Sequence, residues 1–366
     1  MSQQPTRDDA RPVPAEPLRT WAARCFVAAG MPEPDAALLA DSLVQTSLWG
    51  IDSHGVALLP HYLTRLDNGS IRARPALTVH RTGPATALLE GDQGQGIVVA
   101  HRAMAEAVSL AREQGVGAVG VRNASHCGAI GLYTRAAARQ GCVGVAFTHA
   151  DSVAVPHGGR RAFLGTNPIS FAFPRVAPAG AVAGVPTGQW GEPVCLDMAT
   201  TSIPWNRVRN ARREGHPLPP DVAVDTRGEP TTDAAAAAAV VPLGGAGYGH
   251  KGYALALVVD LLCGPLMGNP YGKHIPSMFG ALDEPRRLGA FFIALDPERF
   301  AGGAFFATQV EAMARDLADE PGAPMMPGDP EIAVAAVRSR DGVPIEPGLA
   351  EQFRSWGARL GVPAPL

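Results

Sequence analysis

A glycine-rich stretch near position 115 restricts the folds that this chain can adopt. Residues 115–120 read Gly-Val-Gly-Ala-Val-Gly and satisfy the spacing Gly-x-Gly-x-x-Gly. In a dinucleotide-binding fold of the Rossmann type, such glycines follow a strand and open a helix, so that backbone N–H groups reach a diphosphate. Here the apolar spacing of Val98, Met104, Val108 and Leu110 predicts a helix before the glycines, and the residues up to 121 predict a strand after them. We therefore reject a Rossmann-type site at this position.

Helical and strand patterns are mixed along the rest of the chain. Helical spacing predicts helices at 17–30, 35–49, 132–139, 253–266, 306–317 and 332–340, and apolar runs predict strands at 142–148, 193–197 and 289–295. Residues 1–16 and 341–366 are polar and contain several prolines, and we expect both as tails, the first of them disordered. Residues 176–191 predict a loop. With 366 residues, the chain is long enough for two domains.

Composition argues against several classes of partner. Charged residues make up 18% of the chain and the formal net charge is −3, which gives no electrostatic case for binding nucleic acid or an anionic membrane. The longest apolar run, 253–267, is broken by Asp260 and Pro265 and is too short to span a bilayer. The five cysteines are scattered without paired spacing, so we expect neither disulfides nor a metal site, and a cytoplasmic location.

A histidine lies between two predicted helices, in the sequence Gly-Ile-Asp-Ser-His-Gly at 50–55. Histidine titrates near neutral pH and is therefore the most common proton donor or acceptor at a reaction centre. Ser53 can fix the ring of His54, and Asp52 can stabilise its positive charge. The alternative is that Asp52 and Ser53 only cap the helix expected from Val56.

A second histidine lies in a predicted strand–loop–helix segment, Asn-Ala-Ser-His-Cys-Gly-Ala-Ile-Gly at 123–131. Small residues at such a turn let an anion approach the first N–H groups of the helix and the positive end of its dipole. From this loop His126 can touch a substrate or a cofactor. The alternative is a polar turn residue without a chemical role.

Two further segments place polar side chains at the ends of elements. In Leu-Gly-Thr-Asn-Pro at 164–168, the proline keeps Asn167 out of the helical region, so that its amide and the Thr166 hydroxyl can point into a site. Asp197 ends a predicted strand and precedes several hydroxyl residues, a position from which a carboxylate often orients a histidine. A plain turn at Asn167 and a helix cap at Asp197 are the alternatives.

A glycine loop at 244–252 precedes the strongest helical pattern in the chain. Glycines followed by a lysine at a helix start are typical of phosphate binding. The loop is not a Walker A motif, because His250 occupies the position of the final glycine and no serine or threonine follows Lys251. We expect Lys251 to be a counter-ion for a diphosphate or a carboxylate; the alternative is a solvated lysine in a flexible loop.

Together these segments resemble the malate/L-lactate dehydrogenase family, which lacks the Rossmann fold and includes malate, ureidoglycolate and sulfolactate dehydrogenases and ketimine reductases. The resemblance rests on six motifs in family order: Asp-Ser-His-Gly at 52–55, Ser-His-Cys-Gly-Ala at 125–129, Leu-Gly-Thr-Asn-Pro at 164–168, Leu-Asp-Met-Ala-Thr at 196–200, Gly-His-Lys-Gly-Tyr at 249–253 and Phe-Phe-Ile-Ala-Leu-Asp-Pro at 291–297. It implies a mixed α/β (α+β) fold, with a largely antiparallel sheet in a cofactor domain at 119–309. A helix-rich domain at 17–118 plus 310–366 would bind substrate and form a homodimer.

The resemblance also implies an activity: hydride transfer between NAD or NADP and a carbon beside a carboxylate, in a 2-oxo, 2-hydroxy or cyclic 2-imino acid. His54 matches the family's proton donor or acceptor, and Ser53 and Asp197 match residues that relay charge to it. Tyr62, His126 and position 58 match the substrate pocket. The matches to the cofactor-binding segments are His126, Gly128, Ala129, Ile130, Gly131, Thr166, Asn167, Lys251 and Gly252.

Two positions depart from the family pattern. Many members carry an arginine four residues after the histidine that binds the substrate carboxylate through two parallel hydrogen bonds; here this residue is Leu58. If Leu58 faces the pocket, as residue i+4 of one helix would, a clamp worth about 2–3 kcal/mol is missing. The substrate would then be less charged, unless Arg65 or His61 replaces the clamp. Residues 204–207, Pro-Trp-Asn-Arg, replace an Ala-Arg-Gly-Lys-like run and put cofactor contacts there in doubt.

Two other classes of function remain open from the sequence. Leu58 favours a regulatory or inactive NAD(P)-binding paralogue, which turnover of a 2-oxo or 2-imino acid would dismiss. A lyase or a phosphate-binding hydrolase would use the loop at 244–251 and would act without a nicotinamide. The sequence also leaves the cofactor open, because Asp151 can bind a ribose diol whereas Arg160 and Arg161 can bind a 2′-phosphate.

Overall fold

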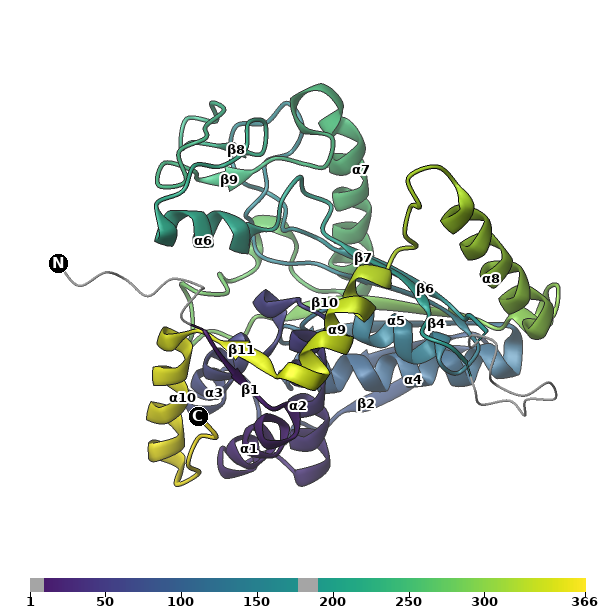
Figure 1. Ribbon diagram of the computed structural model, residues 1–366, viewed down its shortest axis with the longest axis horizontal. Coiled ribbons are helices and arrows are strands. Elements are labelled where there is room, and N and C mark those ends of the chain that lie inside the picture. The colour runs from purple at the N-terminus through teal and green to yellow at the C-terminus, as the bar shows by residue number, and fades with distance from the viewer. Residues whose placement is uncertain (1–9, 177–189) are drawn as a thin grey trace.

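The computed structural model describes residues 10–176 and 190–366, and these form a mixed α/β fold, as predicted (Figure 1). The helices are α1 (Ala15–Ala28), α2 (Glu33–Leu48), α3 (Leu59–Asp67), α4 (Gly96–Gln114), α5 (Gly131–Ala138), α6 (Trp205–Glu214), α7 (Gly245–Cys263), α8 (Gly303–Asp319), α9 (Asp329–Asp341) and α10 (Pro347–Leu360). The strands are β1 (Arg11–Val13), β2 (Thr78–Gly83), β3 (Thr86–Glu90), β4 (Val116–Ala124), β5 (Val143–Thr148), β6 (Ile169–Phe173), β7 (Val194–Met198), β8 (Ala223–Val224), β9 (Ala239–Val240), β10 (Leu288–Leu295) and β11 (Val343–Ile345).

A seven-stranded sheet crosses the middle of the molecule in the order β2-β3-β4-β10-β5-β6-β7. Only β3 and β4 pair in parallel, and every other neighbouring pair in this sheet is antiparallel. Helices α4 and α5 cover one face of the sheet and α7 lies on the other (Figure 1). The prediction of a largely antiparallel sheet is confirmed.

The glycine stretch at 115–120 has the environment that excludes a Rossmann-type site. Helix α4 ends at Gln114, Gly115 follows in the left-handed conformation (φ 89°), and β4 begins one residue later. A Cβ atom at Gly117 would lie 2.0 Å from the carbonyl oxygen of Ala107, and one at Gly120 would lie 1.9 Å from Sδ of Met267. These glycines therefore allow β4 to pack closely against α4 on one side and against the segment after α7 on the other.

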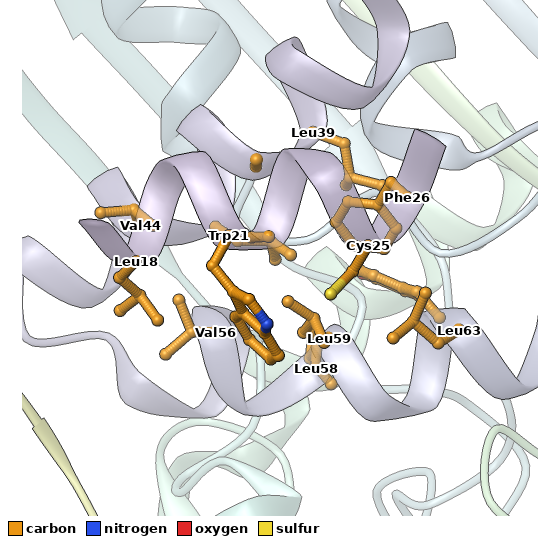
Figure 2. Close-up of a cluster of buried hydrophobic side chains, with 14 of the residues drawn as sticks. Leu18, Trp21, Cys25, Phe26, Leu39, Val44, Val56, Leu58, Leu59 and Leu63 are labelled. Carbon is orange, nitrogen blue, oxygen red and sulfur yellow. The ribbon is translucent and has the colours of Figure 1, made fainter. Parts of the chain in front are cut away.

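The helical part buries a core of its own between α1, α2 and α3 (Figure 2). The C-terminus completes this core, because β11 pairs with β1 and the Phe353 ring of α10 lies 4.8 Å from that of Trp21. The prediction of a polar tail at 341–366 is therefore wrong. Residues 11–16, expected in a disordered tail, lie in β1 and at the start of α1. Residues 1–9 and most of the predicted loop at 176–191 lie outside the described residues.

The seven-stranded sheet contains strands from both predicted domains. Strands β2 and β3 and helix α4, which fall within the predicted helix-rich part at 17–118, belong to the sheet and its core. The other side of α4 contributes Ile97 and Val98 to the helical core. Helix α4 therefore joins the two cores, and the predicted domain boundaries stay a prediction. None of the helices in the described residues is long and apolar enough to cross a membrane.

Candidate active site

His54 lies in a short 3-10 turn, Asp52–His54, between α2 and α3. Its Nδ1 is 2.9 Å from Oγ of Ser53. The next residue must be glycine, because a Cβ at Gly55 would lie 2.0 Å from Oγ of Ser47 in α2. The same Ser47 hydroxyl accepts a hydrogen bond from the backbone N–H of Val56 at 3.0 Å. The histidine turn is therefore pressed against α2 and fixed there.

Asp52 does not contact His54 but pairs with Arg338 of α9. Both guanidinium nitrogens Nη1 and Nη2 donate to its carboxylate, and Nη1 also donates to the carbonyl of Ser47. The expected stabilisation of the His54 charge by Asp52 is therefore replaced by a tie between this turn and α9. Sequence reasoning missed Arg338, which lies 286 residues away from its partner.

The ring of the second histidine, His126, stacks against that of His54. The rings of His54 and His126 are 5.6 Å apart between centroids and only 29° from parallel. Oη of Tyr62 lies 2.7 Å from Nδ1 of His126, and the N–H of Gly128 donates to the same nitrogen at 3.3 Å. Because Nδ1 accepts from an N–H group, neutral His126 carries its proton on Nε2. The structure thus brings His54, Ser53, Tyr62 and His126 together.

Both histidines are neutral at pH 7. Burial lowers the pKa of His54 from its usual 6.5 to about 4. Burial also lowers the pKa of His126 well below 6.5, and the positive charge of nearby Arg286 lowers it further. A neutral His54 is ready to accept a proton from a substrate hydroxyl, while Nε2–H of neutral His126 is a hydrogen-bond donor.

Asp197 contacts the segment that follows His126 in the chain. Its Oδ2 accepts a hydrogen bond from the N–H of Gly131 at 2.7 Å, and so it holds the start of α5 after the His126 loop. Burial raises the pKa of Asp197 to about 6, against the opposing effects of the Gly131 hydrogen bond and of Arg135. The described residues show no hydrogen bond between Asp197 and His54. Asp197 can therefore influence His54 only through the His126 loop or a bound molecule.

Asn167 supports the site without lining it. The side chain is fully buried. Its Oδ1 accepts from the N–H of Ala150 at 3.2 Å, and its Nδ2 donates to the carbonyl of Ala256 in α7 at 2.9 Å. The backbone φ of 36° is a conformation that asparagine tolerates better than most residues. The prediction that this amide points into a site is wrong, whereas the side chain of Thr166 is partly exposed and remains available.

Lys251 lies inside α7, since this helix begins eight residues earlier than predicted. Its ammonium is exposed, lies 5.4 Å from the ring centroid of Tyr248, and has no ion pair among the described residues. Gly252 has a packing role, because a Cβ there would lie 2.4 Å from the backbone nitrogen of Leu243. At the other predicted cofactor segment, Gly128 has φ 67° while Ala129 and Ile130 are buried.

Leu58 does not face the pocket. Its side chain is 5% exposed and packs in the helical core with Trp21 and Leu59 (Figure 2). Gly55 interrupts the backbone with φ −90° and ψ −144°, so His54 and Leu58 lie in separate 3-10 turns and the i, i+4 rule does not apply. The prediction that Leu58 lines the substrate pocket is wrong.

Arg65 cannot replace the missing clamp, because its guanidinium is fully engaged. The side chain is 1% exposed, and its Nε donates to Nε2 of His61 at 3.1 Å. Its other donors bind Oγ of Ser70 and the carbonyls of Met278, Ala281, Leu282 and Glu284. Burial and the charge of Arg65 lower the pKa of His61 to about 3, so His61 is neutral and is no carboxylate partner.

Asp151 has a partner that the sequence did not indicate. Its Oδ1 accepts from Nη2 of buried Arg286 at 2.6 Å, and its Oδ2 accepts from the N–H of Met278 at 3.0 Å. Both oxygens are occupied, which leaves the carboxylate unsuited to a ribose diol.

The segment at 204–207, which departs from the family pattern, forms the start of α6. In this helix the guanidinium of Arg209 stacks over the ring of Phe279, 3.8 Å from its centroid.

Known proteins resemble this chain along nearly its whole length. Residues 13–354 match the Malate/L-lactate dehydrogenase family. A malate dehydrogenase from Pyrococcus abyssi is 33% identical over 361 residues, which cover 96% of this chain and 95% of that protein. A ureidoglycolate dehydrogenase (NAD(+)) from Escherichia coli K12 is 35% identical over 289 residues, 79% of this chain and 78% of that protein. The solved sulfolactate dehydrogenase from Methanocaldococcus jannaschii matches with a TM-score of 0.86 at 32% identity, covering 96% of this chain and 98% of that chain.

The chain belongs to the malate/L-lactate dehydrogenase family, and it is an oxidoreductase that uses NAD or NADP. Its relatives include both cofactor types: the E. coli protein is named for NAD(+), and a (2R)-3-sulfolactate dehydrogenase from Chromohalobacter salexigens, 30% identical over 349 residues, is named for NADP(+). The sequence-based resemblance, fold class, enzyme class and cofactor class are confirmed.

Proposed function

We propose that this protein transfers a hydride between NAD or NADP and the carbon beside the carboxylate of a 2-oxo or 2-hydroxy acid or a cyclic 2-imino acid, with His54 as the proton donor and acceptor. The observation that carries this proposal is the stacked pair of neutral imidazoles, His54 and His126, fixed by Ser53 and Tyr62. The nicotinamide, when bound, supplies or accepts the hydride. The proton that accompanies the hydride is supplied or accepted by side chains of the protein.

Proton transfer follows from how each ring is held. The Ser53 hydroxyl occupies Nδ1 of His54, which leaves Nε2 to exchange a proton with the substrate oxygen or nitrogen. Nε2–H of His126 can donate to the same substrate atom and stabilise the negative charge that develops on it. In oxidation His54 takes the hydroxyl proton, and in reduction it returns one. Asp197 keeps the His126 loop in place through Gly131.

The surface around the start of α7 fits a dinucleotide. Lys251 lies in the second turn of a 19-residue helix, and its side chain can extend towards a diphosphate bound at the positive N-terminal end of that helix. Tyr248 in the same turn is 67% exposed and offers a ring face. We assign diphosphate binding to Lys251 and further contacts to Thr166 and the loop at 128–131. Asn167 and Gly252 hold this surface from beneath.

Lys251→Ala is expected to raise the KM for the cofactor about fivefold, as for the loss of one partly exposed charge contact. The cofactor KM should also become less sensitive to added salt, because a screened cation–diphosphate attraction is lost. Lys273→Ala, at another exposed lysine, is the matched control and should change neither quantity. A cofactor KM that is unchanged in Lys251→Ala would return this lysine to a solvated surface role.

The rate of substrate oxidation should depend on pH as expected for a buried His54 with a lowered pKa. Its base form is the neutral ring, so protonation removes activity and the rate falls only below its pKa of about 4. We therefore expect kcat/KM for a 2-hydroxy acid to stay level as the pH falls through 6.5, the usual histidine value. A loss centred at 6.5 would contradict the proposed environment of His54. A loss near pH 6 that disappears in Asp197→Asn would belong to Asp197, whose pKa is about 6.

The substrate class can be tested with a panel of 2-oxo acids, cyclic 2-imino acids and their esters and amides, each with NADH and NADPH. The proposal predicts loss of the reduced-nicotinamide absorbance with at least one acid. Activity found only without cofactor would favour a lyase or hydrolase. Binding of NAD(P)H without turnover of any member would favour a regulatory paralogue.

We also infer a homodimer in a reducing, cytoplasmic compartment. Helix α7 and the turn after it expose a row of apolar side chains, which a second copy of the chain would bury: Leu255, Val258, Leu261 and Leu266. All five cysteines are buried free thiols, as suits a reducing compartment. Sedimentation equilibrium tests the dimer, and a monomer at micromolar concentration would contradict it.

A further inference from the structure

The guanidinium of Arg286 is buried, and part of its hydrogen-bonding capacity is unused among the described residues. Its side chain is 2% exposed, and Nη2 donates to Asp151 at 2.6 Å. Its Nε and Nη1 are buried and have no hydrogen-bond partner among the described residues. A buried donor without an acceptor costs about 1–3 kcal/mol, and more when the group is charged. Two such nitrogens on one side chain therefore call for an acceptor that protein atoms do not supply.

Charge balance around this residue points to an anion. Two buried guanidiniums, Arg65 and Arg286, lie here with one carboxylate that forms an ion pair, Asp151, which pairs with Arg286; the exposed Asp283 acts on Arg65 without forming an ion pair. Arg65 donates to His61, Ser70 and carbonyl groups, and forms no ion pair among the described residues. Among the described residues, one of these two buried positive charges therefore lacks a direct ion-pair partner, a costly arrangement that one bound carboxylate would relieve.

Arg286 also lies beside the candidate active site. The peptide of Met278 joins the two arginines, since its N–H donates to Asp151 and its carbonyl accepts from Arg65. Arg65 in turn contacts His61, which neighbours Tyr62, the partner of His126. The charge of Arg286 contributes to the lowered pKa of both His126 and His61.

We propose that Arg286 binds the carboxylate of the substrate, in place of the arginine that the family carries at the position of Leu58. This inference rests on the proposed function and names the residue that binds the carboxylate of that substrate, whereas Leu58 alone favours a neutral substrate. Among the described residues, Arg65 is saturated and His61 is neutral, whereas Arg286 has two nitrogens without an acceptor. Because Nε and Nη1 are buried, binding of the carboxylate requires a local shift of the groups that cover them.

The test compares Arg286→Gln with Arg287→Gln, which removes the same charge from the exposed neighbouring residue. The probe is oxamate, a small carboxylate that resembles a 2-oxo acid, titrated calorimetrically into enzyme saturated with NADH or NADPH. Arg286→Gln should weaken oxamate binding about 10- to 100-fold, as expected for loss of a charge-assisted hydrogen bond. The preference in kcat/KM for a 2-oxo acid over its neutral amide should fall by a similar factor. Cofactor affinity should not change, and Arg287→Gln should behave as the wild type.

Wild-type oxamate affinity and acid preference in a folded Arg286→Gln variant would overturn the inference. If that variant does not fold, Arg286→Gln/Asp151→Asn removes the ion pair as a unit, leaves neither of its members unpaired, and is judged by the same two measurements. The proposed function fails separately, when the wild type turns over no 2-oxo or 2-imino acid at all. The oxamate titration does not depend on turnover and so reports on Arg286 in either case.

Discussion

His54→Ala is expected to lower kcat by about 100-fold or more, because the group that exchanges a proton with the substrate is removed. Binding of NADH or NADPH, followed by fluorescence, should stay close to that of the wild type. The reason is that His54 contacts Ser53 and His126 and lies in a turn fixed by Ser47 and Val56, none of which depends on the imidazole for folding. The variant should therefore bind cofactor and fail at the chemical step.

Asp197→Asn provides the comparison. The amide oxygen of asparagine can still accept the N–H of Gly131, so the His126 loop should keep its place and the loss in kcat should be smaller than for His54→Ala. Near-native turnover by His54→Ala would remove His54 from the mechanism. A larger loss in Asp197→Asn than in His54→Ala would make the carboxylate the principal proton-transfer group instead.

Arg65→Met is expected to lower the free energy of unfolding by about 3–5 kcal/mol, because several buried acceptors lose their donor at a cost of about 1–3 kcal/mol each. The methionine fills part of the volume but leaves His61, the Ser70 hydroxyl and several carbonyls at 278–284 without their donor. Urea denaturation measures the change. The segment around Met278 should loosen before the rest of the fold, and hydrogen exchange of its amides should accelerate.

Arg72→Met is the matched control for Arg65→Met. Arg72 is 55% exposed and pairs with Asp92 at 3.3 Å, so its loss should cost under about 1 kcal/mol. Equal destabilisation by the two substitutions would show that the Arg65 network contributes no more than a surface ion pair. It would also reopen Arg65 as a group free to bind substrate.

The parts of the fold that follow local periodicity were predictable from the sequence. Helix α4, its end at the glycines, and strands β4 and β10 follow from apolar spacing and from glycine positions. Helix α10 was missed although its signal was present: Ala350, Phe353 and Gly357 are buried at helical spacing within an otherwise polar segment. The prolines that bound this segment begin and follow the helix and do not mark a tail.

The candidate site was predictable where its contacts are local, as for Ser53 and His54, which are adjacent in the chain. Leu58 was misplaced because Gly55 changes the backbone direction, and no pattern in the sequence reveals that Ser47 approaches within van der Waals distance. The network of Arg65, Asp151 and Arg286 joins residues more than 130 positions apart. Such contacts depend on how α3 packs against the segment before β10, which no local spacing encodes.

Transfer of deuterium tests the central claim most directly. Wild-type enzyme is given NADH or NADPH that carries deuterium at the transferable position of the nicotinamide, together with the best 2-oxo or 2-imino acid of the panel. Direct hydride transfer predicts one deuterium on the product carbon beside the carboxylate, seen by mass spectrometry, and none on that carbon when unlabelled cofactor is used in D₂O. Product without deuterium from the labelled cofactor, or with deuterium from D₂O at that carbon, would contradict hydride transfer by this protein.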